Sequence, residues 1–368
     1  MHWNWEFPEW PTFHVTNGLI GVQEDRFLIR SGRLAGAVKH LMPRDADPLT
    51  IELIQSEAIE TSAIEGETLN RESVRSSLRR EFGLTVQRRH VTPAEHGIAA
   101  LMVELYRHFD APISDETLFG WHRLLLQGRT DVESGHYRCH AETMRVVSGA
   151  LGAQKVHFEA PPSTRIPSEM TRFLKWFEET GPRGSARLRP VTRAALAHLY
   201  FVAIHPFEDG NGRLARALAE RALAQGVGQP SLSALSRTFM RHRKAYYAAL
   251  ARTNRTLDAD DWVAWFADRV IEAQAFAEEW VEFLIAKARL LDRVRGKLNP
   301  RQEKALLRVL REGPEGWMGG VSAGDYAAIT DASPATATRD LAELVSLGVF
   351  ARTGERRGAR YWLVLTVE

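Results

Sequence analysis

The stretch HPFEDGNGRLAR, residues 205–216, places a histidine, two carboxylates, two arginines and the turn sequence Gly-Asn-Gly between two helical segments. Residues 192–204 (TRAALAHLYFVAI) before it and residues 213–226 after it have the apolar spacing of helices. Pro206 cannot donate a hydrogen bond within a helix, so we expect residues 205–212 to form a loop. The chain around this loop is therefore expected to be mainly helical.

The glycine-containing turn at the end of this loop has the features of an anion site. Gly210, Asn211 and Gly212 can adopt unusual backbone angles and expose amide hydrogens at the positive end of the next helix. Arg213 and Arg216 are three residues apart, so their side chains share one face of that helix. Helix starts of this kind bind phosphate, and two guanidiniums would hold a polyphosphate along its length.

Two further groups in the loop carry chemistry. Asp209 is a carboxylate beside an anion site, an arrangement that Mg²⁺ stabilises by bridging the carboxylate to phosphate oxygens. His205 has an ordinary pKa of about 6.5, so it can accept a proton near neutral pH. Together these parts predict nucleotide transfer, in which a base deprotonates an attacking hydroxyl. The alternative is a capped loop with a buried histidine and surface arginines.

The same stretch resembles the Fic-domain motif HPFx(D/E)GNGRxxR at every specified position. The resemblance implies a helical enzyme that uses ATP and Mg²⁺ and transfers AMP to a Ser, Thr or Tyr hydroxyl of a target protein. In this sequence the motif's base is His205, its magnesium ligand is Asp209, and its nucleotide-binding residues are Gly210, Asn211, Gly212, Arg213 and Arg216. Arg216 would hold the terminal phosphate. The intact Gly-Asn-Gly-Arg sequence favours nucleotidyl transfer over the phosphorylation of a kinase-like branch.

Two other stretches extend the resemblance. Residues 144–158 contain two short β-prone runs around a turn, which predicts a hairpin inside the helical domain. It corresponds in position to the Fic flap, which holds a target segment by edge pairing. The sequence YYAALARTN is similar to the stretch that holds adenine and implies Tyr247 and Asn254 as base contacts. Aromatic residues at helical spacing can instead be core residues.

The sequence TSAIEG, residues 61–66, is similar to the Fic inhibitory motif [S/T]xxxE[G/N], with Thr61, Glu65 and Gly66 at its fixed positions. It lies at the end of a helix expected to start at Asp47 and to stop at Gly66. The resemblance implies that Glu65 pairs with Arg216 and holds the enzyme inactive. Two alternatives stay open: a simple helix end, or a deAMPylating or bifunctional enzyme in which this glutamate positions water.

The last part of the chain has a different pattern, with three short helical segments followed by two strands around a charged turn. This order is typical of a winged-helix domain. Basic and hydroxyl side chains that suit DNA contacts are Thr336, Thr338, Arg339, Arg352, Arg356, Arg357 and Arg360. Residues 298–368 nevertheless contain nine basic and nine acidic side chains, and this balance argues against DNA binding. A DNA-binding regulator with a nucleotide-sensing Fic domain is the rival prediction, and a domain that contacts protein is a third.

Composition and length indicate the number of domains and the general class of protein. The 368 residues are 44% hydrophobic and 26% charged, and we expect three regions: a helical region with the inhibitory helix at 1–90, a Fic catalytic domain at 91–290 and a winged helix at 298–368. Total charge, 48 basic against 46 acidic residues, gives no argument for nucleic acid or membrane binding. A single cysteine and the lack of a long apolar run predict a cytoplasmic protein without membrane contact. A homodimer is compatible with the family.

Overall fold

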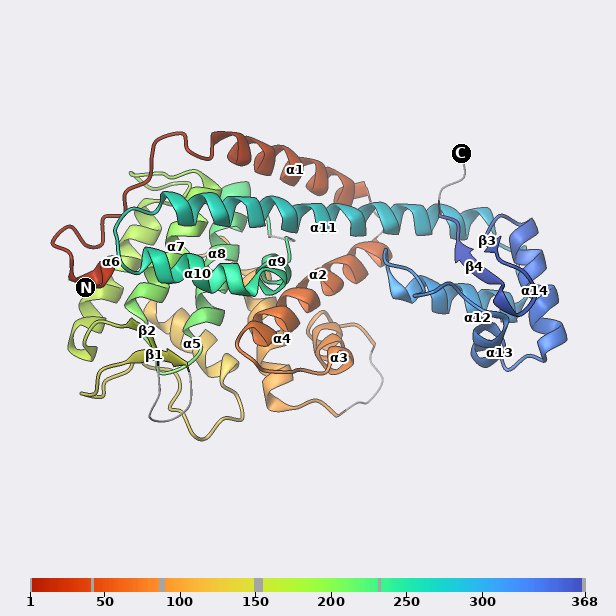
Figure 1. Ribbon diagram of the computed structural model, residues 1–368, viewed down its shortest axis with the longest axis horizontal. Helices are drawn as coiled ribbons and strands as arrows, with labels where there is room; N and C mark the ends of the chain where they lie inside the picture. Colours follow the sequence, from red (N-terminus) through yellow and green to blue (C-terminus); the bar gives the residue numbers. More distant parts are fainter. Residues whose placement is uncertain (1, 41–42, 86–89, 149–154, 231–232, 366–368) are drawn as a thin grey trace. The chain divides into compact units, whose positions relative to one another are not determined.

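The computed structural model describes residues 2–40, 43–85, 90–148, 155–230 and 233–365. Within these residues the chain is mainly helical, with strands only in two small hairpins (Figure 1), which confirms the expected fold class. It divides into two compact units, Met1–Gly36 with Ala46–Ala277, and Ala37–Asp45 with Glu278–Glu368. The three domain ranges expected from the sequence stay predictions. None of the described helices combines the length and the apolar character that crossing a membrane requires.

Three helices follow the aromatic first segment: α1 (Gly21–His40), α2 (Pro43–Ile64) and α3 (Arg71–Glu81). The sequence analysis did not predict α1, whose three glycines lower its helix propensity. The start expected for α2 at Asp47 was wrong, because the helix already begins at Pro43, a residue suited to a first helical position. Gly66 adopts a φ of 89° just beyond α2, as expected for a residue that stops a helix.

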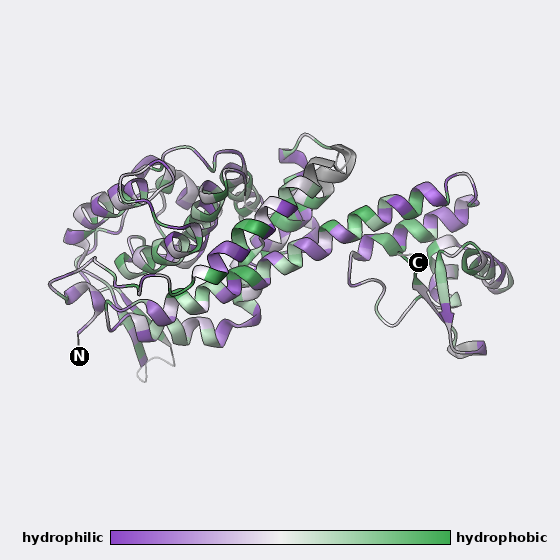
Figure 2. Cartoon of the chain, turned by 90° about the horizontal axis from the view of Figure 1, so that it is seen from above, coloured by the Kyte–Doolittle hydropathy of each residue, from purple (hydrophilic) through white to green (hydrophobic). Residues whose placement is uncertain are grey.

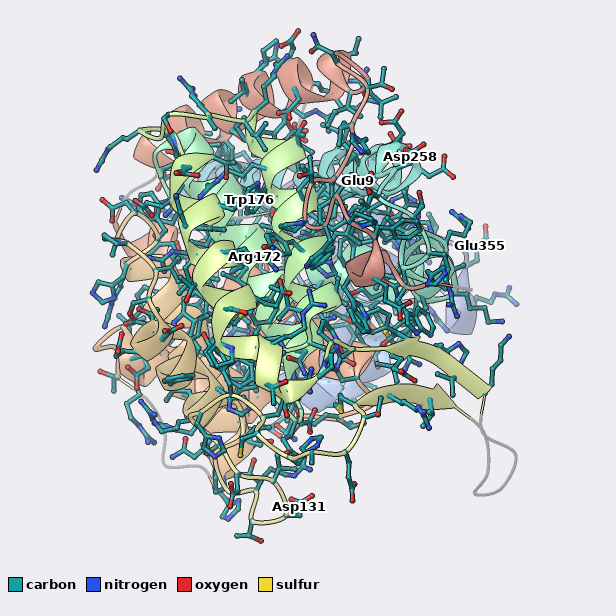
Figure 3. The ribbon with its side chains drawn as sticks, turned by 90° about the vertical axis from the view of Figure 1, so that its left-hand side faces the viewer. Glu9, Asp131, Arg172, Trp176, Asp258 and Glu355 are labelled. Atoms are coloured by element: carbon teal, nitrogen blue, oxygen red, sulfur yellow. The ribbon has the colours of Figure 1, made fainter. Side chains whose placement is uncertain are left out.

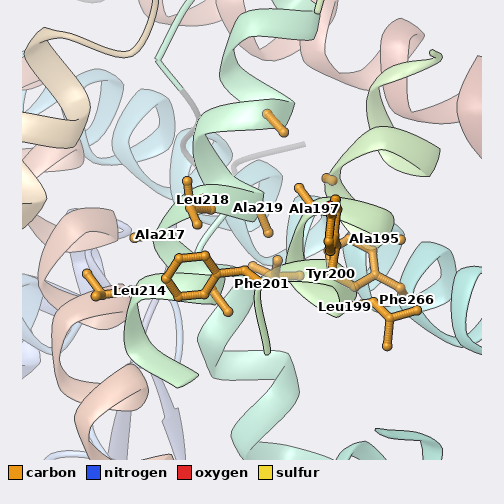
Figure 4. Packing of buried hydrophobic residues seen from close by; sticks show 14 of the residues in the cluster. Ala195, Ala197, Leu199, Tyr200, Phe201, Leu214, Ala217, Leu218, Ala219 and Phe266 are labelled. Carbon is orange, nitrogen blue, oxygen red and sulfur yellow. The ribbon is translucent and has the colours of Figure 1, made fainter. Parts of the chain in front are cut away.

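Helices also make up the rest of the first unit: α4 (Pro93–Arg107), α5 (Asp115–Leu125), α6 (Ile166–Glu179), α7 (Pro190–Ile204), α8 (Asn211–Val227), α9 (Leu235–Arg241), α10 (Arg243–Thr253) and the start of α11 (Asp260–Arg293). Polar and apolar residues are interspersed along the helices of the chain (Figure 2), whereas α7 is buried over nearly its whole length. α7 and α8 lie side by side in the core, where Phe201, Leu214 and Leu218 are fully buried (Figure 4). The loop between them is thus held at both ends by buried helices.

Tryptophans near the start of the chain pack against this core. Trp10 donates from its ring nitrogen to Glu169 on α6 at 2.9 Å and packs edge-on against Tyr200 of α7. Trp5 donates to the carbonyl oxygen of Glu159 at 2.7 Å. The aromatic side chains are therefore packing residues that tie the start of the chain to α6, α7 and the strand that contains Glu159.

The predicted hairpin is present as β1 (Arg145–Ser148) and β2 (Lys155–Glu159), which pair antiparallel. The two strands extend away from the helices (Figure 3). Phe158 is buried and anchors β2, whereas Val146, Val147 and Val156 are 38%, 39% and 41% exposed. The turn predicted between the strands falls on residues 149–154, which lie outside the described residues. The hairpin therefore has a fixed base and an apolar outer part.

The second unit contains α12 (Pro300–Val309), α13 (Ala323–Thr330) and α14 (Pro334–Ser346), followed by β3 (Phe350–Thr353) and β4 (Arg360–Leu363). Three helices and a hairpin occur in the expected order. The buried carboxylate of Asp340 on α14 accepts hydrogen bonds from Tyr326 on α13 and Arg301 on α12, each at 3.0 Å. One side chain therefore joins the three helices.

Candidate active site

The loop between α7 and α8 is held in one shape by its own residues. His205 has left-handed backbone angles, φ 51° and ψ 58°, which end α7. Phe207 is fully buried, and its backbone N–H and C=O both bond to the side chain of Asn211, at 2.9 and 2.8 Å. The ring of Phe207 stacks on His122 of α5 with 4.1 Å between centroids. Asn211 therefore uses its side chain to hold the loop in this shape.

His205 is oriented as a proton acceptor. Its Nδ1 lies 3.3 Å from the carbonyl oxygen of Val202, and a carbonyl only accepts, so Nδ1 carries the hydrogen and Nε2 is the free acceptor. Burial lowers the pKa of His205 to about 4, although the Val202 carbonyl opposes this shift. The ring is thus neutral at pH 7, but it is a weaker base than its ordinary pKa implies. Arg138 fixes the backbone here by donating from Nε to the carbonyl oxygen of His205 at 2.8 Å.

The start of α8 has the geometry that an anion site requires. Gly210 has a φ of 81°, and a Cβ there would lie 2.7 Å from Leu125 Cδ2, so both conformation and space require glycine. The first hydrogen bond within α8 runs from Leu214 N–H to the Gly210 carbonyl at 3.0 Å. The amides of residues 211–213 precede that bond and form the positive end of the helix.

Asp209 lies at this helix start with a partly exposed side chain. Its carboxylate pairs with Arg129 at 3.1 Å and Arg213 at 3.7 Å, and it accepts the Gly210 amide at 2.6 Å. Among the described residues there is no group of three or more His, Cys, Asp or Glu side chains that would hold a metal ion by themselves. One accessible carboxylate nevertheless fits Mg²⁺, which takes its other ligands from phosphate and water.

His122 and Arg129 were not predicted from the sequence. His122 Nδ1 accepts the Gly135 amide at 3.0 Å, so its Nε2 carries hydrogen and donates to the Asp209 carbonyl at 3.2 Å. Arg129 also pairs with Asp131, in the loop after α5 (Figure 3). Both residues act on Asp209 from a distant part of the chain, and no local sequence pattern indicates this.

Arg216 is fully buried, and residues at the end of α2 accept most of its hydrogen bonds. Its Nε donates to Thr61 Oγ1 at 2.8 Å, and its NH2 donates to the Thr61 carbonyl at 2.9 Å and to Glu65 Oε1 at 2.8 Å. NH1 lies 3.4 Å from Tyr246 Oη. The structure therefore brings the two separate motifs, residues 61–66 and 205–216, into direct contact.

The Glu65 carboxylate also lies against the start of α8. A Cβ on Gly212 would lie only 2.3 Å from Glu65 Oε1 and 3.3 Å from Arg216 NH1. Glycine is thus needed for this close approach. Within the described part of the chain the amides at this helix start have no backbone partner, and a carboxylate next to them and to an arginine occupies the kind of position that a phosphate oxygen takes.

Glu67 is a second carboxylate that the sequence analysis missed. Its Oε2 lies 2.7 Å from Arg213 NH1, so each arginine of the motif has a carboxylate partner from the segment after α2. The reversal at Gly66 turns residues 65 and 67 toward the same helix. The sequence signal that could have indicated Glu67 is a pair of glutamates on either side of a glycine that stops a helix.

The two residues predicted to contact adenine lie at different distances from this cluster. Tyr247 is 41% exposed and donates to the Ile64 carbonyl at 3.3 Å, so it lies beside the end of α2. Asn254 is buried at the end of α10, where its carbonyl accepts the Asn4 amide at 2.8 Å. Their roles as base contacts stay predictions.

Comparison with known protein families matches two segments of the chain. Residues 112–223 match the Fic/DOC family. Residues 3–84 match a domain of unknown function, DUF4172. Residues 112–223 thus form a Fic domain, and the loop between α7 and α8 with Arg213 and Arg216 lies within it.

Named relatives share part of this sequence, and a solved structure shares the fold. The chain is 26% identical over 200 residues to the protein adenylyltransferase fic-1 of Caenorhabditis elegans, a match that covers 53% of this chain and 35% of that protein. It is 28% identical over 209 residues to the protein adenylyltransferase Fic of Drosophila melanogaster, covering 56% and 38%. The matches thus span little more than a third of these relatives. A crystal structure of a Fic family protein from Desulfovibrio desulfuricans aligns over 97% of this chain and 99% of that chain, with 22% identity and a TM-score of 0.54.

Proposed function

We propose that this protein transfers AMP from ATP to a hydroxyl side chain of a target protein, and that its own α2 holds the reaction back. The observation that carries the proposal is the free Nε2 of His205 at one end of a loop whose other end is an anion-binding helix start with Arg213 and Arg216. Relatives named protein adenylyltransferase support the choice of ATP and of a protein target. Incubating the Glu65→Gly variant with α-labelled ATP in a cell lysate tests it: a labelled protein is expected, and no label transfer would contradict it.

The site residues divide the reaction between them. Helix amides 211–213 and the two arginines bind the phosphates, and the neutral His205 takes the proton of the attacking hydroxyl at Nε2. Asp209 would hold Mg²⁺, which supplies charge neutralisation of the phosphates when it is bound. The hydroxyl oxygen forms a bond to the α-phosphorus, and pyrophosphate leaves. The residue that accepts AMP is a side chain of the target.

The resting arrangement opposes this reaction through the same arginines. Arg216 is engaged by Thr61 and Glu65, and Arg213 by Glu67. A terminal phosphate that binds Arg216 must displace the Glu65 carboxylate, because both anions need the same guanidinium. Nucleotide can still enter, but its phosphates are not aligned for attack. Inhibition therefore acts more on transfer than on nucleotide affinity.

The contact of Glu67 gives a first prediction. Glu67→Gln removes the charge that holds Arg213, and we expect transfer by the purified protein to rise about two- to fivefold. The effect is small because Glu67 is 35% exposed, and partly exposed ion pairs contribute about 0.2 to 1 kcal/mol. Glu72→Gln on α3 is the matched control and should change nothing. Equal rates for Glu67→Gln and the unsubstituted protein would remove Glu67 from the inhibitory contact.

The hairpin gives a second prediction, because its base is packed and its outer valines are exposed. We propose that it binds an extended target segment along one edge. Val147→Pro removes a backbone donor from β1, so modification of the target should be lost while ATP affinity, measured by calorimetry, stays unchanged. Val147→Thr keeps the backbone donor and is the control. Loss of ATP affinity to the same degree as target modification would show that the hairpin is only structural.

A further inference from the structure

The charges of the second unit are sorted by position, although residues 298–368 are neutral in sum. Basic residues on α12 are matched by nearby carboxylates. The pairs are Arg301 with Asp340 at 3.0 Å, Lys304 with Asp331 at 3.2 Å, and Arg308 with Glu312. The basic side of α12 is therefore compensated locally.

Two more carboxylates of this unit are engaged inside it. Asp325 accepts the Ser322 amide at 2.9 Å and caps α13. Glu343 accepts a hydrogen bond from the side chain of Gln302 at 2.8 Å. These two carboxylates stabilise the three helices by hydrogen bonds within the unit. A neutral total charge can therefore coexist with an uneven distribution of charge over the surface.

The basic residues of α14 and the hairpin have no such partners. Arg339 on α14 and Arg352 on β3 are exposed, as is Arg356 between the strands, and Arg360 on β4 is half-buried. Among the described residues of this unit, none of these four guanidiniums pairs with a carboxylate. Four positive charges thus lie on the one helix and hairpin that follow each other in sequence and pack together, against one exposed carboxylate of the hairpin, Glu355.

The exposed side of α14 has the chemistry of a groove-reading helix. Ala337, Asp340, Leu341 and Leu344 point inward and are buried. Its exposed side chains before Glu343 are small, hydroxyl-bearing or basic: Ser333, Pro334, Ala335, Thr338, Arg339 and Ala342. Arginine and hydroxyl side chains bond base edges and phosphates, and methyl groups contact thymine. A helix of 13 residues with this surface fits the major groove of DNA.

We propose that α14 and the β3–β4 hairpin bind duplex DNA, with α14 in the major groove and the hairpin arginines on phosphates. The inference goes beyond the proposed transfer of AMP and does not depend on it. A protein partner is favoured less, because the exposed side of α14 carries small, hydroxyl-bearing and charged side chains and no large apolar one. Trp362 on the hairpin is 44% exposed, and it donates to Thr353 at 2.8 Å.

The test is binding of the full-length chain to a short fluorescent DNA duplex of mixed sequence, followed by anisotropy. If four arginines neutralise phosphates, the slope of log affinity against log salt is about −3.6, so affinity should fall about a hundredfold between about 50 and 200 mM salt. Arg352→Gln with Arg356→Gln should reduce the slope by about two, and Arg339→Gln by about one. Unchanged thermal unfolding checks that these exposed substitutions leave the fold intact.

Arg308→Gln is the matched control, because it removes the same charge from the same unit at a residue that is already paired. We expect the salt slope of this variant to equal that of the unsubstituted chain. Absence of binding at protein concentrations up to about 10⁻⁴ M at low salt would overturn the proposal and leave this face to a protein partner. Equal weakening by Arg308→Gln and Arg339→Gln would overturn it as well, since binding would then follow total charge and not this surface.

Discussion

Replacing His205 by alanine is expected to lower AMP transfer about a hundredfold or more, measured in the Glu65→Gly background so that the starting rate is high. The Nε2 of His205 is the free acceptor at the loop, and losing a general base typically costs this much. ATP affinity should persist, because the phosphates are held by the helix amides and by Arg213 and Arg216. Calorimetry with ATP measures this second quantity separately.

A nearby histidine provides the control for this substitution. His140 lies 3.3 Å from Glu208 of the same loop. His140→Ala therefore removes an imidazole close to the site, yet we expect its transfer rate to stay within about threefold of the parent. Near-normal transfer by His205→Ala, or an equal loss in both variants, would refute the role of His205 as the base.

The second large effect is expected from Glu65→Gly, which should raise self-modification at least tenfold. Opposite charges about 4 Å apart attract by roughly 4 kcal/mol at an effective dielectric near 20, and desolvation offsets part of this. About 1.4 kcal/mol of net pairing already corresponds to a factor of ten in rate. Since Arg216 is fully buried, its pairing with Glu65 is screened less than a surface pair.

Two variants separate release of Arg216 from a general loosening of α2. Glu60→Gly places a glycine inside α2, five residues before Glu65, and leaves Glu65 in place, so it should activate far less. Glu65→Gly combined with His205→Ala should be silent if the activity belongs to this site. If Glu65→Gly is no more active than the unsubstituted protein, or only as active as Glu60→Gly, the carboxylate is not the inhibitor.

Local signals in the sequence were sufficient for the loop, the hairpin and the end of α2. Pro206 interrupts the helices, Gly66 and Gly210 permit positive φ, and β-branched residues mark the strands. Each of these signals acts through the backbone of a few neighbouring residues. Such features depend little on the rest of the chain, so they can be predicted before the fold is known.

Contacts between distant segments could not be predicted in the same way. Arg129 and Asp209 are 80 residues apart, and Arg213 and Glu67 are 146 apart. Their pairing depends on how α2, α5 and α8 pack. The lowered pKa of His205 is likewise a consequence of burial, which the motif does not specify. The resemblance to the Fic motif supplied the pairing of Glu65 with Arg216, which residue types alone do not indicate.

The transfer of AMP under control of Glu65 is tested most directly by incubating purified Glu65→Gly in parallel with ATP labelled at the α-phosphate and at the γ-phosphate. We expect protein to retain label from α-labelled ATP only, because pyrophosphate leaves with the β- and γ-phosphates. We also expect at least tenfold less label on the unsubstituted protein. Label retained only from γ-labelled ATP would show phosphorylation and contradict the transfer of AMP.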